Sequence, residues 1–168
     1  LDAVSCVEAL GKASLADPTR CVIKGGSAGG YTVLNALVRY PGVFKAGICL
    51  YGVSNLFTLD IDTHKFEQHY THSLVGPLPE AAGRYHAWSP SFHAEKIRDP
   101  LIIFQGSEDR VVPPAQSEEI VATLNRTGVP HEYVVFEGEG HGFRKSENIA
   151  RYLHQTERFL MQHVLFSP

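Results

Sequence analysis

The chain has 168 residues, of which 43% are hydrophobic and 20% charged, and its formal net charge at pH 7 is −3. This composition is typical of one soluble globular domain with a single core, and it gives no electrostatic basis for binding nucleic acid or an anionic membrane surface. No apolar run in the sequence approaches the length that spans a bilayer. The chain has neither an initial methionine nor a basic leader, so we expect it to start inside a longer polypeptide.

The first third of the chain predicts helix, strand, helix and strand in turn. Apolar residues at near-helical spacing indicate a helix over 2–16, and a short apolar run indicates a strand over 21–24. A core-facing apolar stripe then predicts a helix over 31–40, which a Pro-Gly pair ends. The unbroken apolar run over 46–51 is typical of a strand covered on both faces, as in a parallel sheet.

The junction between the first strand and the second helix reads Gly25-Gly26-Ser27-Ala28-Gly29, a G-x-S-x-G motif. Strand, sharp turn and helix is the context of a nucleophile elbow, where a serine is held in a strained backbone conformation. We expect Gly25 and Gly29 to be needed on both sides of the serine because bulkier neighbours would collide. Ser27 is therefore a candidate nucleophile, and the Ala28 N–H a candidate oxyanion donor. The alternative is a Gly/Ser-rich loop without chemistry.

Residues 52–97 interrupt the regular alternation and are too long for a simple connection in a compact domain. They contain three prolines, five histidines and six aromatic residues, so we expect short helices that line a substrate pocket. For each aromatic residue taken singly, ordinary packing in the core is an equally good interpretation. The candidates for the pocket are Tyr31, Phe57, Phe66, Tyr70 and Trp88.

Neither the histidines nor the cysteines have the spacing of a metal site. His64, Glu67, His69 and His72 lie close together in the sequence, but no second cluster completes a ligand set, so we expect solvated surface there. The three cysteines are Cys6, Cys21 and Cys49, and the last two stand in strand-like runs. We interpret them as reduced core residues, which favours a cytoplasmic setting.

The last part of the chain continues the alternation. Strands are predicted over 101–104 and 132–136, with helices over 114–126 and 144–164. Alternating strands and helices predict an α/β fold, a parallel sheet flanked by helices. In such sheets ligands bind at the carboxyl ends of the strands, so the loops after the strands are the places to look for chemistry.

Three of those loops carry Ser27, Asp109 and His141, in that order. A serine hydroxyl becomes a good nucleophile when an imidazole takes its proton, and a carboxylate fixes the tautomer of that imidazole. The order serine, acid, histidine is the one that α/β-hydrolases use. Glu108 is a rival acid, but Asp109 lies deeper toward the following turn. The alternative for Asp109 is a turn residue without a catalytic role, and the alternative for His141 is a histidine of a surface loop.

The chain resembles the carboxyl-terminal catalytic part of prolyl oligopeptidase-family serine peptidases, in the acylaminoacyl-peptidase and dipeptidyl-peptidase-like branch. The matching motifs are GGSAGGYT over 25–32, Trp88-Ser89-Pro90 with His93-Ala94, QGSEDRVVP over 105–113, and EGHGF over 139–143.

The resemblance implies the carboxyl-terminal half of an α/β-hydrolase domain over 1–168, with about four strands and with 52–97 as an inserted pocket-lining segment. It implies Ser27 as nucleophile, Asp109 as acid and His141 as base, with no cofactor. It further implies cleavage of short peptides or acylated amino acids, while a carboxylesterase remains the alternative.

The chain departs from the family pattern in one respect. It contains no histidine-glycine-glycine-type loop, which supplies the second oxyanion donor in the family, and losing one such donor costs roughly 10²–10³ in kcat. The strand over 21–24, central in a full domain, would become an apolar edge that invites pairing with another chain. We therefore hypothesise a homo-oligomer, or association with the rest of a longer enzyme, through that strand. A non-catalytic half-domain that acts by assembly is the second hypothesis.

Overall fold

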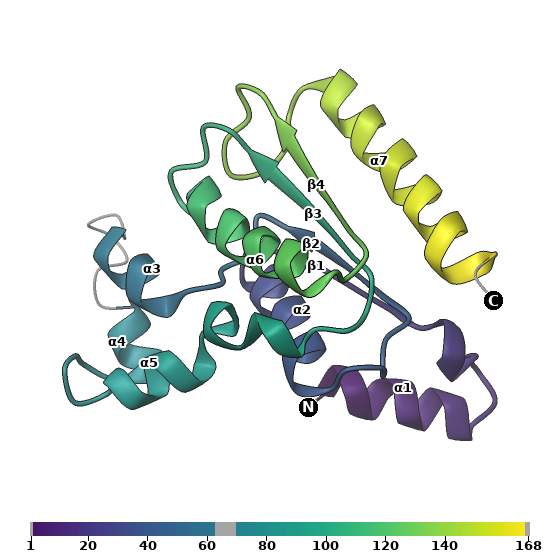
Figure 1. Cartoon of the computed structure of the whole chain (residues 1–168), viewed down its shortest axis with the longest axis horizontal. Coiled ribbons are helices and arrows are strands. Elements are labelled where there is room, and N and C mark those ends of the chain that lie inside the picture. Colours follow the sequence, from purple (N-terminus) through teal and green to yellow (C-terminus); the bar gives the residue numbers. More distant parts are fainter. Residues whose placement is uncertain (1, 63–69, 167–168) are drawn as a thin grey trace.

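The computed structural model describes residues 2–62 and 70–166, with side chains described for all of these except 60–62 and 70. In this part of the chain four parallel strands form one sheet (Figure 1). They are β1 (Val22–Gly26), β2 (Ala46–Leu50), β3 (Leu101–Gly106) and β4 (His131–Phe136), in the order β1-β2-β3-β4. The α/β fold with a parallel sheet of about four strands is thus confirmed. The register aligns the carboxyl ends of the strands, because Gly26 pairs with Leu50 and Gly106 with Phe136.

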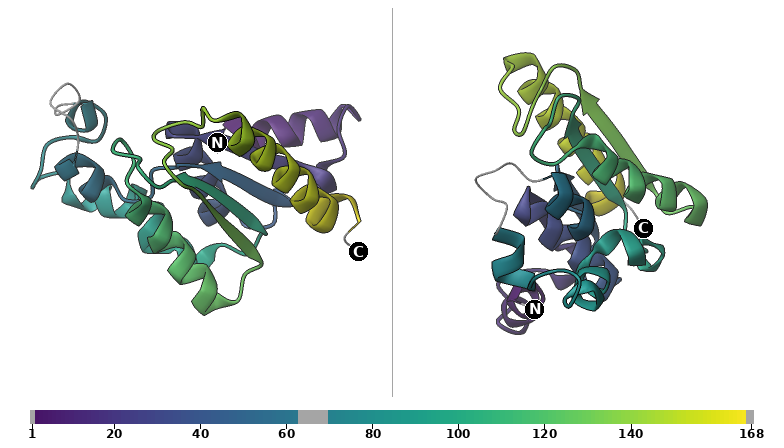
Figure 2. Two further views of the ribbon diagram at one scale, coloured as in Figure 1. Left: turned by 90° about the horizontal axis from the view of Figure 1, so that it is seen from above. Right: turned by 90° about the vertical axis from the view of Figure 1, so that its left-hand side faces the viewer.

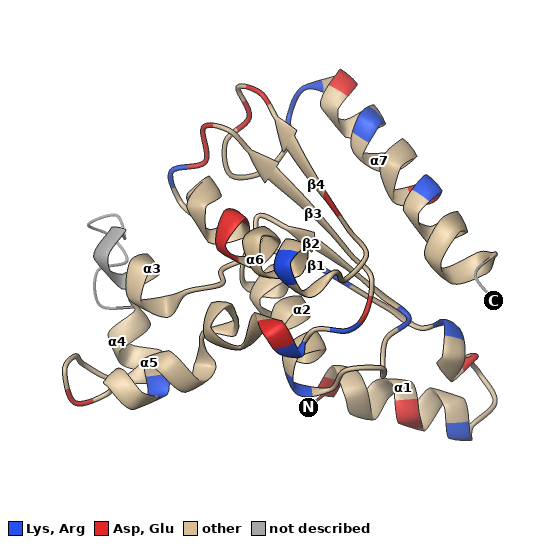
Figure 3. Cartoon of the chain, in the orientation of Figure 1, with Lys and Arg blue, Asp and Glu red and all other residues tan. Residues whose placement is uncertain are grey.

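Helices cover both faces of the sheet. One core lies between the sheet and the helices α1 (Asp2–Lys12), α2 (Ala28–Arg39) and α6 (Pro114–Thr127), and a second core lies under α7 (Ser146–Leu160). The strands supply both cores through their alternating side chains: Leu101 and Ile103 belong to the first, Ile102 and Phe104 to the second. Figure 2 shows the sheet and the helices on its two faces from two further directions. The long helices α1, α6 and α7 each carry both acidic and basic residues (Figure 3).

Residues 52–97 contain short helices, as predicted. These are α3 (Leu56–Asp62), α4 (Tyr70–Val75), α5 (Ala82–Trp88) and a 3₁₀ helix over Pro90–Lys96. The helices α3, α4 and α5 form a lobe beside the sheet, on the left in Figure 1. We call them the pocket lobe.

A buried glutamine joins the pocket lobe to α6. The Gln116 Oε1 atom accepts hydrogen bonds from the backbone N–H groups of Ser54 and Asn55, both at 2.7 Å. Its Nε2 atom donates to the Asn55 carbonyl at 3.0 Å and to the Thr58 hydroxyl at 2.8 Å. Gln116 is only 3% exposed, so these bonds replace the water that its amide gives up on burial. The turn between β2 and α3 is thereby fixed to α6.

Several predicted boundaries differ from the structure for local reasons. The first helix ends at Lys12 rather than 16, because Ser14 takes a left-handed backbone conformation (φ 57°) and Asp17 caps a separate 3₁₀ turn. The second helix begins at Ala28, three residues before the predicted start, directly after Ser27. The last helix begins at Ser146 rather than 144, and a π-helical turn over Met161–Leu165 continues it.

The strand β1 lies at the end of the strand order, so its only strand neighbour among the described residues is β2. The edge position predicted for the strand over 21–24 is therefore observed. Lys24 is exposed on this strand, and its ammonium group lies 5.2 Å from the centre of the Tyr152 ring on α7.

Candidate active site

Ser27 stands on a strained turn between β1 and α2. Its φ of 55° and ψ of −119° lie outside the regions that non-glycine residues ordinarily occupy. The turn is held on both sides, since the Ser27 N–H donates to the Leu50 carbonyl and its carbonyl accepts from the Tyr31 N–H, both at 3.0 Å. Strain of this kind costs on the order of 1–3 kcal/mol and persists only where the surroundings enforce it.

The steric need for glycine in this turn falls on Gly25 and Gly30. A Cβ on Gly25 would lie 2.4 Å from the Gly29 carbonyl oxygen, and one on Gly30 would lie 2.5 Å from the Gly52 Cα. A Cβ on Gly29 would meet nothing within 4 Å. The prediction that Gly29 is needed for space is therefore wrong, because it is the backbone of Gly29, not its missing side chain, that fills the elbow.

Asp109 follows β3 and is fully buried at its side chain. One carboxylate oxygen, Oδ1, accepts the backbone N–H groups of Val111 and Val112, both at 2.9 Å. The other oxygen, Oδ2, lies 2.9 Å from the His141 Nδ1 atom. Glu108, the rival acid, has an exposed side chain. The turn after β3 thus presents a single orientated carboxylate to the imidazole.

His141 joins the acid to the serine. Its Nδ1 atom donates to Asp109, which leaves Nε2 as the acceptor for the Ser27 hydroxyl at 2.9 Å. The glycines on either side of His141 form an isolated bridge with one another, and Gly142 has a left-handed φ of 99°. The imidazole is 23% exposed, so one side of it is open to a substrate. The three residues singled out from the sequence therefore lie in one hydrogen-bonded chain.

Tyr51 is a site residue that the sequence pattern did not single out. It follows β2 directly, has a left-handed φ of 38°, and packs its ring against the His141 imidazole with 4.7 Å between ring centres. A Cβ on Gly26 would lie 3.1 Å from this ring, so the glycine before Ser27 makes room for it. Burial raises the pKa of the Tyr51 phenol. The position could have been found by the same rule as Ser27, Asp109 and His141, since it stands at the carboxyl end of a strand.

Ala28 is the first residue of α2, and its N–H belongs to the helix N-terminus, where N–H groups have no acceptor inside the helix. The helix dipole adds partial positive charge at the same place. Next to the Ser27 hydroxyl, this N–H group can stabilise negative charge on a substrate oxygen.

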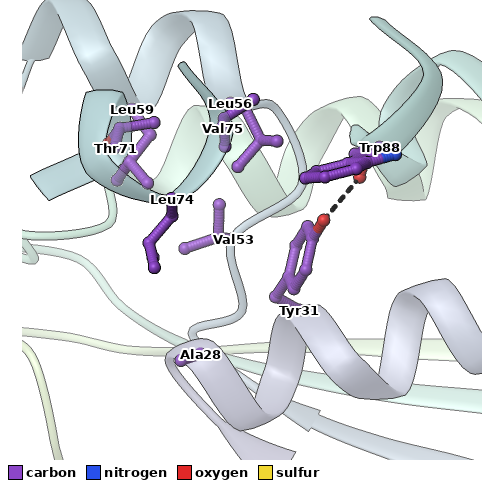
Figure 4. Close-up of a pocket in the computed structure, with 9 residues that line it drawn as sticks. All are labelled: Ala28, Tyr31, Val53, Leu56, Leu59, Thr71, Leu74, Val75 and Trp88. Atoms are coloured by element: carbon purple, nitrogen blue, oxygen red, sulfur yellow. Dashed lines mark hydrogen bonds between the residues drawn. The ribbon is translucent and has the colours of Figure 1, made fainter. Parts of the chain in front are cut away.

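A cavity of about 280 Å³ opens beside Ala28, between α2 and the pocket lobe (Figure 4). Tyr31 and Trp88 line it. The Tyr31 hydroxyl donates to the Trp88 backbone carbonyl at 2.9 Å, so the polar group of this tyrosine is hydrogen-bonded to the protein. Every side chain of the lining is uncharged: Ala28, Tyr31, Val53, Leu56, Leu59, Thr71, Leu74, Val75 and Trp88.

The other aromatic candidates stand differently. Phe57 is not in the lining; its ring packs against Tyr85 with 5.2 Å between ring centres. Phe66 and the side chain of Tyr70 lie outside the described residues. Four aliphatic residues of α3 and α4 that were not candidates also line the cavity: Leu56, Leu59, Leu74 and Val75. The helices of this lobe are six or seven residues long, too short to show a clear apolar period in the sequence.

The described residues contain no group of three or more His, Cys, Asp or Glu side chains that could hold a metal ion, while His64, Glu67 and His69 lie outside them. Cys49 is buried, which raises the pKa of its thiol to about 12. Cys21 is half-buried and Cys6 is exposed, so the prediction that the cysteines are core residues is wrong for Cys6. In the same part of the chain no helix has the length and apolarity to cross a membrane.

Comparison with known proteins gives consistent matches. The family model for the prolyl oligopeptidase family matches residues 1–166. Dipeptidyl aminopeptidase BIII of Pseudoxanthomonas mexicana is 34% identical over 168 residues, which cover 96% of this chain and 24% of that protein.

Two solved structures are similar over nearly the whole chain. A puromycin-hydrolyzing peptidase of Mycobacterium tuberculosis has a TM-score of 0.94 and 41% identity, over 99% of this chain and 25% of that one. An acylaminoacyl peptidase in complex with Z-Gly-Gly-Phe-chloromethyl ketone has a TM-score of 0.81 and 28% identity, over 94% and 26%. The chain thus spans about a quarter of the length of these relatives.

Proposed function

The chain belongs to the prolyl oligopeptidase family, a family of peptidases, and from this premise we propose that it hydrolyses short peptides or acylated amino acids through an acyl-enzyme on Ser27. One observation carries the proposal: the two hydrogen bonds of 2.9 Å that join Ser27 to His141 and His141 to Asp109. This arrangement supports the roles proposed for Ser27 as nucleophile, His141 as base and Asp109 as acid in acyl transfer.

The first half of the reaction forms the acyl-enzyme. The Ser27 Oγ atom attacks the carbonyl carbon of the substrate while the His141 Nε2 atom takes its proton. The negative charge that develops on the carbonyl oxygen is stabilised by the Ala28 N–H. The imidazolium then gives its proton to the leaving amine, the C–N bond breaks, and the acyl group stays on Ser27.

The second half returns the enzyme to its starting state. A water molecule gives a proton to His141 and attacks the acyl carbon, and the ester bond to Ser27 breaks as the serine oxygen takes that proton back. Asp109 keeps the imidazole in the required tautomer and stabilises its cation throughout. Its Oδ1 atom is occupied by two backbone N–H groups, so only Oδ2 faces the imidazole.

The cavity beside Ala28 is proposed as the site for the side chain on the acyl side of the cleaved bond. Because none of its lining side chains is charged, we expect an apolar or aromatic side chain to bind there and an acidic or basic one to be rejected. Burying a Leu or Phe side chain contributes about 1.5–3 kcal/mol, or about 10- to 150-fold in kcat/KM. In the related acylaminoacyl peptidase, the inhibitor likewise presents Phe next to its reactive ketone.

We also propose that residues 52–97 act as the pocket wall of a partial α/β-hydrolase domain. Seven of the nine lining residues, Val53 to Trp88, come from this segment. Substitutions in this wall can then change the shape of the cavity without changing Ser27, Asp109 or His141.

The decisive test is labelling of the purified chain with a fluorophosphonate, which forms a covalent adduct with an activated serine. We expect labelling of the wild-type chain and none of Ser27→Ala. Absence of labelling in a folded wild-type sample, or labelling that persists in Ser27→Ala, would overturn the proposal. Turnover of aminoacyl arylamides against short-acyl aryl esters then separates a peptidase from a carboxylesterase.

The edge strand β1 supports a second proposal, that the chain associates through it. Its outer side has no strand neighbour among the described residues, and such an edge can pair with another strand. A partner bound there would lie next to Gly26 and Ser27 and could supply a second oxyanion donor. Size-exclusion chromatography with light scattering tests this, and a monomer at high concentration would contradict self-association.

A further inference from the structure

Glu139 is a buried carboxylate in the loop between β4 and α7, two residues before His141 and 3% exposed. Its Oε1 atom accepts the Lys145 backbone N–H and the Asn148 side-chain amide, both at 2.9 Å. Its Oε2 atom accepts the Arg144 backbone N–H at 3.0 Å. These hydrogen bonds, led by the one from Asn148, lower the pKa of the Glu139 carboxyl group, so it is ionised at neutral pH.

The three bonds close the base of the loop that carries His141. They connect residue 139 to residues 144, 145 and 148, so residues 140–143 form the tip. Two glycines flank His141 in that tip, and glycine adds backbone freedom that the loop must lose for the imidazole to hold one position. Without the carboxylate, the Gly140–Gly142 bridge and the hydrogen bond of 2.9 Å from the Lys145 ammonium to the Glu137 carbonyl would be left to hold the loop.

Glu139 also contacts the loop of the acid. Its backbone carbonyl accepts the Glu108 N–H at 2.9 Å, one residue before Asp109. The two loops approach closely, because a Cβ on Gly106 would lie 2.5 Å from the Glu139 carbonyl oxygen. Glu139 therefore lies where the loop of the acid and the loop of the base meet.

We propose that Glu139 is a positioning residue for acyl transfer: its carboxylate clamps the His141 loop so that the imidazole reaches Asp109 and Ser27 at once. This inference rests on the proposed function of the same site. A simple cap for the start of α7 would use the same bonds, but it would act on stability alone and leave the imidazole unchanged. The two roles are separable by measurement.

The chemistry of the clamp suggests the variant. Glutamine has the volume of glutamate but only one acceptor oxygen, so in Glu139→Gln an NH₂ group must face a backbone N–H donor. At least one bond of the clamp is then lost without a cavity. Glu137→Gln is the matched control, because Glu137 lies on the same loop with an exposed side chain and its substitution removes the same charge. Asn148→Ala is a second variant that removes one donor and leaves the carboxylate in place.

The experiment uses the full chain and three readouts: the rate of fluorophosphonate labelling, the kcat and KM for an apolar aminoacyl arylamide, and the NMR resonance of the imidazole proton shared with Asp109. A misplacement of about 1 Å costs on the order of 10²-fold in rate. We expect Glu139→Gln to lower kcat and the labelling rate about 10- to 100-fold with KM within about twofold, and to broaden or shift the imidazole resonance. Asn148→Ala should show a smaller loss in the same direction, and Glu137→Gln should match the wild type.

Two outcomes would overturn the inference: wild-type rates with an unchanged resonance in Glu139→Gln, which would leave a cap for α7 as its role, or an equal loss in Glu137→Gln. If Glu139→Gln fails to fold, Asn148→Ala decides by the same readouts. If the wild-type chain is not labelled at all, the proposed function fails, while the resonance still decides whether the carboxylate positions His141.

Discussion

Replacing Asp109 by asparagine changes one atom of the site and should invert the tautomer of His141. The asparagine oxygen is expected to keep the place of Oδ1, since that position accepts two backbone N–H groups from Val111 and Val112. The amide nitrogen then takes the place of Oδ2, 2.9 Å from the His141 Nδ1 atom. Facing a donor, Nδ1 must become the acceptor, which puts the proton of the imidazole on Nε2.

An imidazole with its proton on Nε2 donates to the Ser27 oxygen and cannot take the serine proton. The cost is that of losing the correct tautomer, about 10⁴ in kcat or roughly 5 kcal/mol of transition-state stabilisation. Folding should change much less, because the two backbone hydrogen bonds and the volume of the side chain are kept. The prediction is thus a large loss of rate in a protein that is still folded.

The assay is the rate of fluorophosphonate labelling, with circular dichroism and thermal unfolding on the same samples. Glu108→Gln is the matched control, since its side chain is exposed beside Asp109 and its loss should leave the rate within about twofold of the wild type. A rate for Asp109→Asn within tenfold of the wild type would refute the reasoning, and so would a large loss in Glu108→Gln.

Three further predictions concern the pocket, the elbow and the buried thiol. Val75→Phe puts a larger side chain into the lining and reduces the free space of a cavity of about 280 Å³. The kcat/KM should therefore fall at least tenfold for a phenylalanyl arylamide and far less for an alanyl one. Gly25→Ala places a Cβ 2.4 Å from the Gly29 oxygen and should destabilise the fold by about 1–3 kcal/mol in urea unfolding, whereas Gly29→Ala should not, because that Cβ meets no atom within 4 Å. Burial raises the pKa of Cys49 from 9.0 to about 12, so its contribution to stability is complete below pH 9 and is lost as pH rises toward 12, at up to about 1.4 kcal/mol per pH unit. Urea unfolding from pH 8 to 11 should show a flatter decline in Cys49→Ala.

The sequence is most informative where the position of a residue in the fold directly determines the local residue pattern. The apolar run over 46–51 predicts a buried strand because both faces of β2 are covered, and all five residues of that strand are buried. Ser27, Asp109 and His141 can be singled out because each follows a strand of a parallel sheet, and the shared register brings those strand ends together.

The remaining features depend on contacts between distant segments. Tyr51 adopts a left-handed conformation because its ring fits between Gly26 and His141, which no local pattern near residue 51 encodes. In the sequence Glu139 is one of several charged loop residues, and only the structure reveals the three hydrogen bonds that its carboxylate accepts. Phe57 is an obvious pocket candidate in the sequence, but its ring packs against Tyr85. The cavity is lined instead by Tyr31, Trp88 and mainly aliphatic side chains.

The hydrogen bonds of Gln116 determine which parts of the substrate site can change together. They fix Ser54 and Asn55 to α6, so the neighbouring Val53 keeps its place in the lining opposite Ala28 whatever happens further out in the pocket lobe. The outer lining from α4, including Leu74 and Val75, has no such tie to Gln116. Substitutions in the outer wall can therefore reshape the cavity without moving Ser27, whereas a substitution at Gln116, which does not itself line the cavity, should shift Val53 and change the inner wall beside Ala28.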